Sequence, residues 1–534
     1  MTTWVEVPQA VRSLESEPML ARLRAFFNPD DPARLPSRIF WTGLLIRVLS
    51  MTVAHTFRMR VIEDHFEFGW EMGRIARALV TGYGFADPFN GHSGPTAWTP
   101  PLYPLLIAAA FKLFGVYTLK ASWFLLFVNS IFSASTGVAV YRIARLCFSP
   151  GAGGLSSARG LSSAGGLNIA RSLSIARWSG WLWALYPAAM QYAVKWIWDM
   201  ALTAFLFSWV LVLALRLRGL GEQPRTSNLK PRTRLWLLFG LLWGLIALSN
   251  SSLLTFLPAC GLWIVWPALR TRTGVVAALR NATLAAIVFA AVVSPWVIRN
   301  WRVFHAFVPM RSNFGAELYE ATTFSNDGFP WMATLPLAET APEFRRYERI
   351  GEIAYSKQQG EIAKAKIRAH PDLFAKNALR RVFFFWVSVP HPYDSDKLGS
   401  ILTEAVRRVN FAFLSFSGIL GLALAIRRHI PGAWLFFWAF AIYPFLYYFV
   451  TVQARFRHPL EPIICVLSVY LFQSADRTRA WSWFAAGREY EAKLAVLRAA
   501  IDEGDASGIA EGDVFARVRR ARNLPAKERR AVGD

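Results

Sequence analysis

Apolar segments of membrane-spanning length recur along this chain and restrict its fold more than any other feature. A helix needs ~20 apolar residues to cross a bilayer, and these runs are continuous rather than alternating, as β-barrel strands would be. With 54% hydrophobic residues, the composition is not that of a soluble globular protein. We therefore predict an all-α polytopic membrane protein with about ten spans. The predicted spans are 39–57, 123–140, 178–192, 197–215, 235–249, 253–266, 282–297, 411–426, 433–450 and 460–472.

The excess of Lys and Arg over Asp and Glu follows the positive-inside rule of membrane proteins, so we do not interpret it as a nucleic-acid-binding surface. The formal net charge is +24, and much of the Lys and Arg lies in short loops, where it orients the helices. The loop 142–177 contains five arginines and no acidic residue, which predicts a cytoplasmic loop. Segment 102–114 would invert this arrangement if it crossed the bilayer, and it is too short for a span. It is therefore predicted to lie in the outer interface as an amphipathic or re-entrant helix.

The same pattern divides the chain into five predicted parts. These are a cytoplasmic N-terminal segment (1–38), a membrane module (39–298) with its first outer loop (58–120), an extracytoplasmic domain (299–408), C-terminal membrane helices (409–475) and a cytoplasmic tail (476–534). The extracytoplasmic domain is expected to have mixed structure. It includes a charged helix over 343–369 and a basic amphipathic helix over 371–386, which is suited to the membrane surface. Four imperfect six-residue copies over 153–176 predict a flexible linker.

Three carboxylates follow the first predicted span. Asp64, Glu67 and Glu71 are spaced by three and four residues, so a helix would place them on one face. A carboxylate there can act as a general base that takes a proton from an acceptor hydroxyl or amine. The alternatives are a metal site, an ion pair with Arg74, or an ordinary solvated helix face.

Further polar residues are predicted to lie on the same outer side. Charged groups at the ends of spans are functional candidates, although Lys195 and Asp199 could also form a simple ion pair four residues apart. Arginine is suited to phosphate because its planar guanidinium donates paired hydrogen bonds, with lipid headgroups as the alternative ligand. The candidates for holding phosphate are Arg455, Arg457, His458, Lys195 and Arg299, and those for a substrate loop are Asp199, Asn300, Arg311 and Asn313.

Familiar soluble-ligand motifs do not occur in a supporting context. No nucleotide-binding glycine-rich loop or metalloprotease motif is present, so an enzyme of this kind would take its donor from the membrane. The three cysteines, Cys147, Cys260 and Cys465, lack the spacing of a metal site or a disulfide framework. No metal ligands are therefore assigned, and a divalent metal is kept as an alternative cofactor.

The order of these motifs resembles the GT-C superfamily of integral-membrane glycosyltransferases. The resemblance covers roughly residues 40–475 and lies closest to the bacterial branch related to protein O-mannosyltransferases and the lipid A aminoarabinose transferase. It rests on ARALVTGYGFADPF, GPTAWTPPLYPLLIAAAFKLFG, LYPAAMQYAVKWIWDMALTAFLF, SPWVIRNWRVFHAFVPMRSNFGAELYE and RFRHPLEP.

The resemblance implies an inverting enzyme of the bacterial cytoplasmic membrane, with its active site on the extracytoplasmic side. Its donor would be a polyprenyl-phosphate-linked sugar, and its acceptor an extracytoplasmic lipid, glycan or protein. The family's base is an acidic residue of the first outer loop, which by position falls nearest Glu67. The chain lacks the family's Asp-Glu pair there, so Asp64 and Glu71 remain alternatives.

A polytopic transporter or lipid flippase is the alternative from another functional class. Transporters commonly have two repeated halves and bind their substrates near the bilayer midplane. The chain has no such repeat, and its polar clusters lie at the predicted outer edge. These features favour the transferase.

Overall fold

The computed structural model describes residues 33–59, 68–148, 169–221, 230–323, 336, 341–389 and 397–474. Residues Met1–Gln473 form one compact unit, and Ser474–Asp534 form a second, of which the structure describes only Ser474. Within the described ranges the chain is helical with no strand, and two residues, Ala86 and Pro95, form an isolated antiparallel bridge. The predicted all-α fold class is confirmed.

A helix or a pair of helices occupies each predicted span. They are α3 (Leu35–Val53), α6 (Leu119–Phe148), α7 (Ile169–Leu185) with α8 (Pro187–Val194), α9 (Met200–Leu217), α10 (Lys230–Ala247), η1 (Ser251–Phe256) with α11 (Leu257–Val265), α12 (Arg272–Phe304), α17 (Leu398–Arg427), α18 (Ala433–Ile442) with α19 (Phe445–Phe449), and α20 (Glu461–Ser474). Among the described residues, α6, α9, α12 and α17 are long and apolar enough to cross a membrane by length and composition alone. The count of ten spans stays a prediction.

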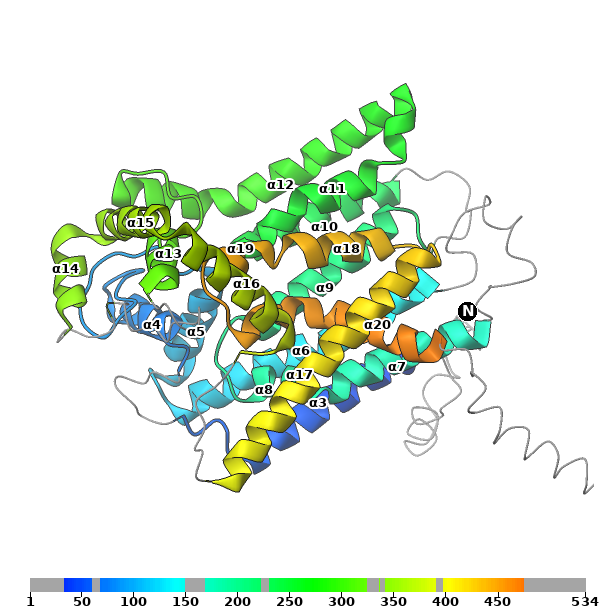
Figure 1. Cartoon of the computed structure of the whole chain (residues 1–534), viewed down its shortest axis with the longest axis horizontal. Helices are drawn as coiled ribbons and strands as arrows, with labels where there is room; N and C mark the ends of the chain where they lie inside the picture. The colour runs from blue at the N-terminus through cyan, green and yellow to red at the C-terminus, as the bar shows by residue number, and fades with distance from the viewer. Residues whose placement is uncertain are drawn as a thin grey trace, which may run out of the picture. The chain divides into compact units, whose positions relative to one another are not determined.

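Helices α6 and α9 form the centre of this bundle (Figure 1). Helix α6 contacts α3, α7 and α9, while α10 packs on both α9 and α12. The apolar window of α9 is 83% buried, whereas that of α12 is only 11% buried, so α12 presents its apolar face outward. Gly240 lets α10 approach α12 closely, because a Cβ there would lie 2.2 Å from the backbone oxygen of Ala285. Small residues at such crossings are typical of membrane helix pairs.

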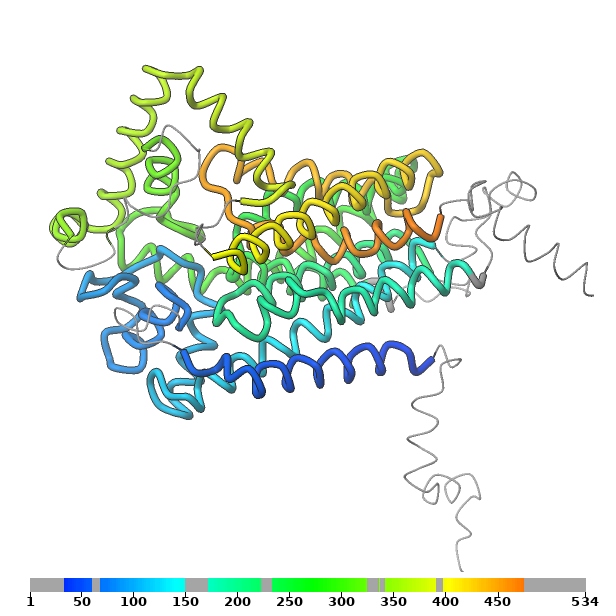
Figure 2. Tube along the Cα trace, turned by 60° about the horizontal axis from the view of Figure 1, so that its bottom comes forward, coloured from blue at the N-terminus to red at the C-terminus, as the bar shows by residue number. Residues whose placement is uncertain are grey.

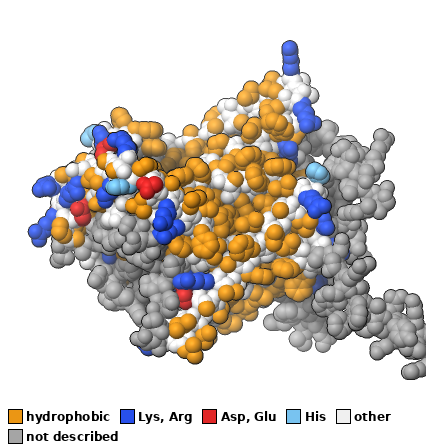
Figure 3. Space-filling model, in the orientation of Figure 1, with side chains coloured by type: hydrophobic (Ala, Val, Ile, Leu, Met, Phe, Trp, Pro, Cys, Tyr) orange, Lys and Arg blue, Asp and Glu red, His pale blue; other side chains and the backbone are white. Residues whose placement is uncertain are grey.

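Hydrophobic side chains cover much of the surface between the two ends of the bundle. Figure 3 shows this on one face, where Lys, Arg, Asp and Glu gather toward the ends. Leu420 and Phe413 of α17 are 58% and 55% exposed, and Trp434 of α18 is 52% exposed. Exposed apolar area on this scale would be unfavourable in water and is favourable against lipid chains. The molecule is a membrane protein.

Shorter helices gather at one end of the bundle, as Figures 1 and 2 both show. They are α4 (Glu71–Thr81), α5 (Leu102–Phe114), α13 (Phe314–Thr323), α14 (Pro342–Ile350), α15 (Glu352–Ala369), α16 (Pro371–Val387) and the short η3 (Ala454–Leu460). Helix α5 has the predicted bounds. Its position in the membrane interface stays a prediction. Another short helix, η2 (Ala268–Arg270), precedes α12. We refer to the end that carries α4, α5 and α13 as the site end.

Three local predictions are corrected by the structure. The charged segment 343–369 is two helices, because Gly351 adopts φ +80° between α14 and α15. Helix α4 begins at Glu71 after a turn in which Trp70 has φ +51°, so no continuous helix joins Glu71 to residues 64–67. Asp64 and Glu67 lie outside the described residues. The last of the six-residue copies is not a linker, because α7 already begins at Ile169. The described part of 299–408 is helices joined by loops.

Candidate functional site

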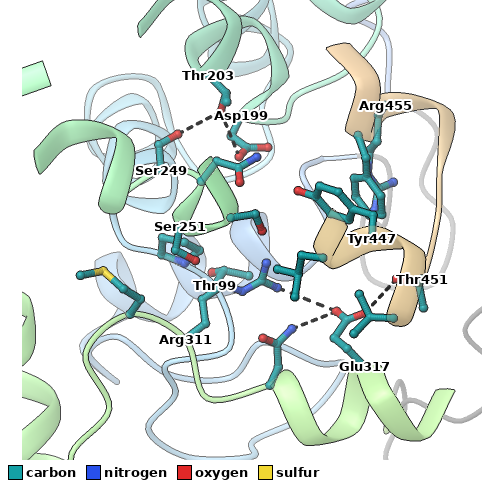
Figure 4. Close-up of a pocket in the computed structure, with 18 of the residues that line it drawn as sticks. Thr99, Asp199, Thr203, Ser249, Ser251, Arg311, Glu317, Tyr447, Thr451 and Arg455 are labelled. Atoms are coloured by element: carbon teal, nitrogen blue, oxygen red, sulfur yellow. Dashed lines mark hydrogen bonds and ion pairs between the residues drawn. The ribbon is translucent and has the colours of Figure 1, made fainter. Parts of the chain in front are cut away.

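A cavity of about 310 Å³ lies at the site end of the bundle (Figure 4). Its walls come from the start of α4, the residue before α9, the loop after α10, the segment before α13, and η3. Five charged side chains line it, and we call this cavity the polar cavity: Glu71, Asp199, Arg311, Glu317 and Arg455. Carboxylates and guanidinium groups that converge in one concave site are the usual mark of a binding or catalytic centre.

Glu71 is the first residue of α4 and lies half-buried on the wall of the polar cavity. Its carboxylate accepts no side-chain hydrogen bond from the residues that the structure describes. Removal from solvent raises the pKa of this carboxyl, against the opposing effects of its own backbone N–H and of Arg455, Arg74 and Arg311. A carboxylate with unused acceptor sites and a raised pKa is suited to take up a proton.

Asp199 lies just outside α9, at its N-cap position. Thr203 donates a long hydrogen bond of 3.4 Å to this carboxylate, and the Thr203 hydroxyl lies 3.3 Å from that of Ser249 (Figure 4). Burial raises the pKa of Asp199 to about 6, while Arg455 and Arg311 act in the opposite direction. This carboxylate is therefore ionised at neutral pH and protonated in mild acid.

Glu317 differs from the other two carboxylates because its oxygens are occupied. It accepts hydrogen bonds from Asn313 Nδ2 at 3.0 Å and from Thr451 Oγ1 at 3.1 Å. Arg311 Nη2 lies 4.0 Å from the same carboxylate, and Arg311 Nε donates to the Trp98 backbone oxygen at 3.0 Å. Glu317 thus ties α13 to the segment that follows α19.

Arg455 is placed where two cavities meet. Its guanidinium carbon lies 4.1 Å from the centroid of the Trp198 ring and 5.3 Å from that of Phe456. It makes no hydrogen bond or ion pair with any other described residue. The cation–π contact with Trp198 holds the guanidinium and leaves its N–H donors available to a ligand.

A second cavity, of about 470 Å³, shares Arg455 and Met200 with the polar cavity. Its other walls come mainly from α8 and α17, and we call it the apolar cavity. Aromatic and aliphatic members include Tyr186, Tyr192, Trp196, Val406 and Phe411. Val406 is 65% exposed, so the cavity opens at the surface of the bundle.

One further cation, Arg407, lines the apolar cavity. Glu404 holds it through contacts of 2.7 Å at Nε and 2.8 Å at Nη2. Arg407 also donates to the Ser388 hydroxyl at 2.9 Å and to the Val389 backbone oxygen at 2.6 Å. Its donors are therefore largely used within the protein, in contrast to those of Arg455.

Arg457 and His458 are predicted phosphate ligands that the structure places in a buried network instead. Arg457 Nη2 lies 3.0 Å from Glu461 Oε1, and His458 Nδ1 lies 2.6 Å from Glu461 Oε2. Arg457 also donates to the Phe411 backbone oxygen at 2.7 Å and to the Ser415 hydroxyl. Neither residue lines either cavity. The network joins η3 to α17 and α20.

Replacing Arg457 with methionine is therefore expected to destabilise the folded protein. Glu461 would stay buried with His458 and the Tyr186 hydroxyl as its remaining partners, and breaking a buried ion pair in this way costs about 3 kcal/mol or more. A lower midpoint of thermal unfolding in detergent would show the loss. The control is Arg408→Met, because Arg408 is 43% exposed and Glu404 would still keep Arg407. Equal unfolding midpoints for the two variants would contradict the prediction.

Other predicted residues also have structural partners. Arg299 donates to the backbone oxygens of Thr96 at 2.6 Å and Phe85 at 2.7 Å, and Asn300 donates to that of Val308 at 2.9 Å. Lys195 is an exposed C-cap residue of α8 and lines neither cavity. The predicted residues that the structure brings together in the polar cavity are Glu71, Asp199, Arg311, Asn313 and Arg455. Among the lining residues that were not singled out from the sequence are Trp198, Glu317 and Arg407.

Metal-binding side chains do not cluster in the described part of the chain. No group of three or more His, Cys, Asp or Glu residues there could hold a metal ion. The three cysteines are buried and unpaired.

Comparison with known proteins finds similarity at the level of structure. No protein-family model matches the chain, and no curated protein sequence matches it. ArnT from Cupriavidus metallidurans, solved bound to undecaprenyl phosphate, is 14% identical, with a TM-score of 0.43 over 85% of this chain and 64% of that one. An oligosaccharyltransferase from Archaeoglobus fulgidus, tethered with an acceptor peptide, is 15% identical, with a TM-score of 0.46 over 82% of this chain and 49% of that one. The same enzyme in complex with Zn and sulfate gives 16% identity and a TM-score of 0.40 over 91% of this chain and 56% of that one.

The chain thus spans between about half and just under two thirds of the length of these solved chains, from 49% to 64%. The likeness to these solved structures concerns the fold alone.

Proposed function

We propose that this protein transfers a sugar from a polyprenyl-phosphate-linked donor to an acceptor on the extracytoplasmic side of a bacterial cytoplasmic membrane. The observation that carries the proposal is the junction at Arg455, where a polar cavity with two available carboxylates meets an apolar cavity open at the bundle surface. A lipid-linked sugar phosphate has three parts with matching chemistry: an apolar chain, an anionic phosphate and a polar sugar.

The apolar cavity would hold the first isoprenoid units of the donor. Its walls on α8 and α17 are aromatic and aliphatic, and Val406 and Asn410 lie at its exposed rim. The phosphate would then lie against Arg455, whose stacked guanidinium has donors to spare. Arg407 adds positive potential from the other side of the apolar cavity. Arginine pairs well with phosphate oxygens because its donors are coplanar.

The reaction would be a single displacement with inversion at the anomeric carbon. Glu71 takes the proton from the acceptor hydroxyl or amine as its oxygen or nitrogen bonds to the anomeric carbon. The bond between that carbon and the phosphate oxygen breaks, and its electron pair stays on the phosphate. Arg455 stabilises the charge that grows on the leaving phosphate, and ionised Asp199 stabilises positive charge on the sugar ring. The products are the glycosylated acceptor and the polyprenyl phosphate.

Arg311 and Asn313, which also line the polar cavity, would contact the acceptor or the sugar. They lie on the segment before α13, next to Glu317, which fixes both. This assigns the acceptor side of the polar cavity to the extracytoplasmic domain. The bilayer, the lipid-linked donor and the extracytoplasmic acceptor are the proposed partners, and no nucleic acid is among them.

The direct test is transfer by the purified full chain in lipid vesicles that contain polyprenyl-phosphate sugars. Mass spectrometry of envelope glycolipids and glycoproteins from cells with and without the protein identifies the acceptor for this assay. A sugar adduct that depends on the protein supports the proposal. Movement of a lipid or solute across the vesicle membrane with no glycosylated product would instead favour a transporter or flippase.

The pH dependence of transfer is expected to have an acidic limb near pH 6. Asp199 has a pKa raised to about 6 by burial, so its stabilising negative charge is present above that pH and is lost as the pH falls through it. Glu71, whose pKa is also raised, loses its ability to accept a proton in the same direction. The profile of kcat/KM against pH measures the limb, and Asp199→Asn should remove the contribution of Asp199. A limb near pH 4, where an ordinary aspartate titrates, would contradict this assignment.

A further inference from the structure

Glu352 is a buried carboxylate outside the polar cavity that joins several segments at the site end. It is the first residue of α15, follows the break at Gly351, and is only 4% exposed. No Lys, Arg or His of the described residues forms an ion pair with it. A buried carboxyl of this kind is costly unless hydrogen bonds satisfy its oxygens.

Four donors fill the two oxygens of Glu352. Oε1 accepts from the Ala97 backbone N–H at 2.7 Å and from the Ser312 hydroxyl at 2.5 Å. Oε2 accepts from the Thr96 hydroxyl at 2.5 Å and from the Tyr347 hydroxyl at 2.6 Å. An ionised carboxylate offers about four acceptor sites, so this side chain is fully used. Its partners come from the first outer loop, the segment before α13, and α14.

The loop and the segment held by Glu352 continue directly into walls of the polar cavity. Thr99 lies two residues after Ala97, and Arg311 and Asn313 flank Ser312. The loop and the segment also bond to each other, because Ser312 N donates to the Ala97 oxygen at 3.1 Å. Arg311 Nε donates to the next carbonyl, that of Trp98, at 3.0 Å. Glu352 therefore sets the backbone that aims Arg311.

We propose that Glu352 is a positioning residue for the transfer reaction, one that fixes Arg311 and Asn313 in the polar cavity through Thr96, Ala97 and Ser312. The expected effect on kcat rests on the proposed function. The expected effect on the position of the cavity wall rests on the geometry alone. Glu352 does not touch the apolar cavity or Arg455, so it acts on the acceptor side and leaves donor binding unchanged.

Glutamine at position 352 keeps the shape of the side chain but replaces one acceptor oxygen with a donor NH₂ group. At the Oε1 position that group would face the Ala97 N–H, which cannot accept, and at the Oε2 position the Thr96 and Tyr347 hydroxyls would have to turn from donating to accepting. In either orientation the charge-assisted hydrogen bonds are lost, so the contact between the outer loop and the Ser312 segment should loosen. For Glu352→Gln we expect kcat to fall ~10- to 10²-fold, since small displacements of positioning groups have effects of this size. The KM for the lipid-linked donor should stay unchanged, and Glu352→Asp should recover part of kcat.

The matched control is Tyr355→Phe. It removes a 3.0 Å hydrogen bond from Tyr355 to Glu343 between the same two helices, α15 and α14, and keeps the Tyr355 ring in its buried cluster with Trp98 and Tyr347. A general loss of stability in this block would affect both variants alike. Only Glu352→Gln is expected to lower kcat while the donor KM is kept.

A reporter cysteine tests the structural part without relying on transfer. All three native cysteines are buried, so a thiol at position 310, which lines the polar cavity, can be labelled selectively in Met310→Cys protein. Adding Glu352→Gln should increase the rate of maleimide labelling several-fold, and adding Tyr355→Phe should not. An unchanged rate, or equal kinetic effects of the two substitutions measured without the reporter, would overturn the proposal. Faster labelling in a protein that shows no transfer would support the positioning role and count against the proposed function alone.

Discussion

Replacing Glu71 with glutamine is expected to lower the rate of sugar transfer ~10²- to 10⁴-fold, the usual contribution of a positioned general base. Glutamine fills the same space at the start of α4 but cannot accept a proton. The neighbouring cations Arg455 and Arg311 would keep their places, so binding of the donor should change little. The measurement is kcat for transfer in vesicles, together with KM for the lipid-linked sugar.

Glu361→Gln is the matched control for this prediction. Glu361 is an exposed carboxylate on α15 that pairs with Lys364 at 2.8 Å and lines neither the polar nor the apolar cavity. Retained transfer in Glu71→Gln would exclude Glu71 as the base. Parallel variants Asp64→Asn, Glu67→Gln and Asp199→Asn would then identify which other carboxylate accepts the proton.

The helices of this protein could be predicted from sequence because a long apolar run in a bilayer is stable only as a helix. A helix satisfies every backbone hydrogen bond within one segment, so runs such as 123–140 and 411–426 lie inside α6 and α17. The positions at which a predicted helix is interrupted were harder to predict. Gly351 interrupts a charged run with no apolar signal, and only its positive φ separates α14 from α15.

The candidate site was partly predictable for a related reason. Asp199, Arg311 and Arg455 are charges beside apolar segments, where an ion is costly and therefore noticeable. Glu317 lies in an ordinary amphipathic helix, and its role in the site depends on a contact with Thr451 that crosses the fold. Such a long-range partner leaves no local pattern in the sequence.

For Arg457 and His458, by contrast, the sequence did contain a local pattern that indicates a structural role. Their spacing to Glu461, four and three residues, is that of ion pairs on one helical face, and this signal was present in RFRHPLEP. Arg299 offered no such signal, because its acceptors are the backbone oxygens of Thr96 and Phe85. Backbone acceptors are shared by all residue types, so a sequence cannot specify them.

Arg455 is the residue whose replacement should have the broadest effect on transfer. Arg455→Lys keeps the charge but loses the planar donors and the stack on Trp198, and we expect kcat/KM to fall ~10²-fold or more. Arg455→Ala should fall further, because the leaving phosphate would develop its charge beside no free cation at the junction. Both kcat and the donor KM should change, since the same group contacts the phosphate before and during bond breaking.

Arg142→Lys provides the matched control, because Arg142 stacks on Trp209 at 4.9 Å and lines neither cavity. If both lysine variants behave alike, loss of an aromatic stack rather than loss of phosphate contact explains the defect. If Arg455→Ala retains transfer, the phosphate must lie elsewhere, and Arg407 is the other cation on the apolar cavity. Arg407 is already bonded to Glu404, Ser388 and Val389, so it would have to leave those partners to bind a phosphate. The two sites therefore predict different outcomes: a phosphate on Arg455 needs no rearrangement, whereas a phosphate on Arg407 would break its pair with Glu404, which keeps Arg408, and loosen the contact between α16 and α17.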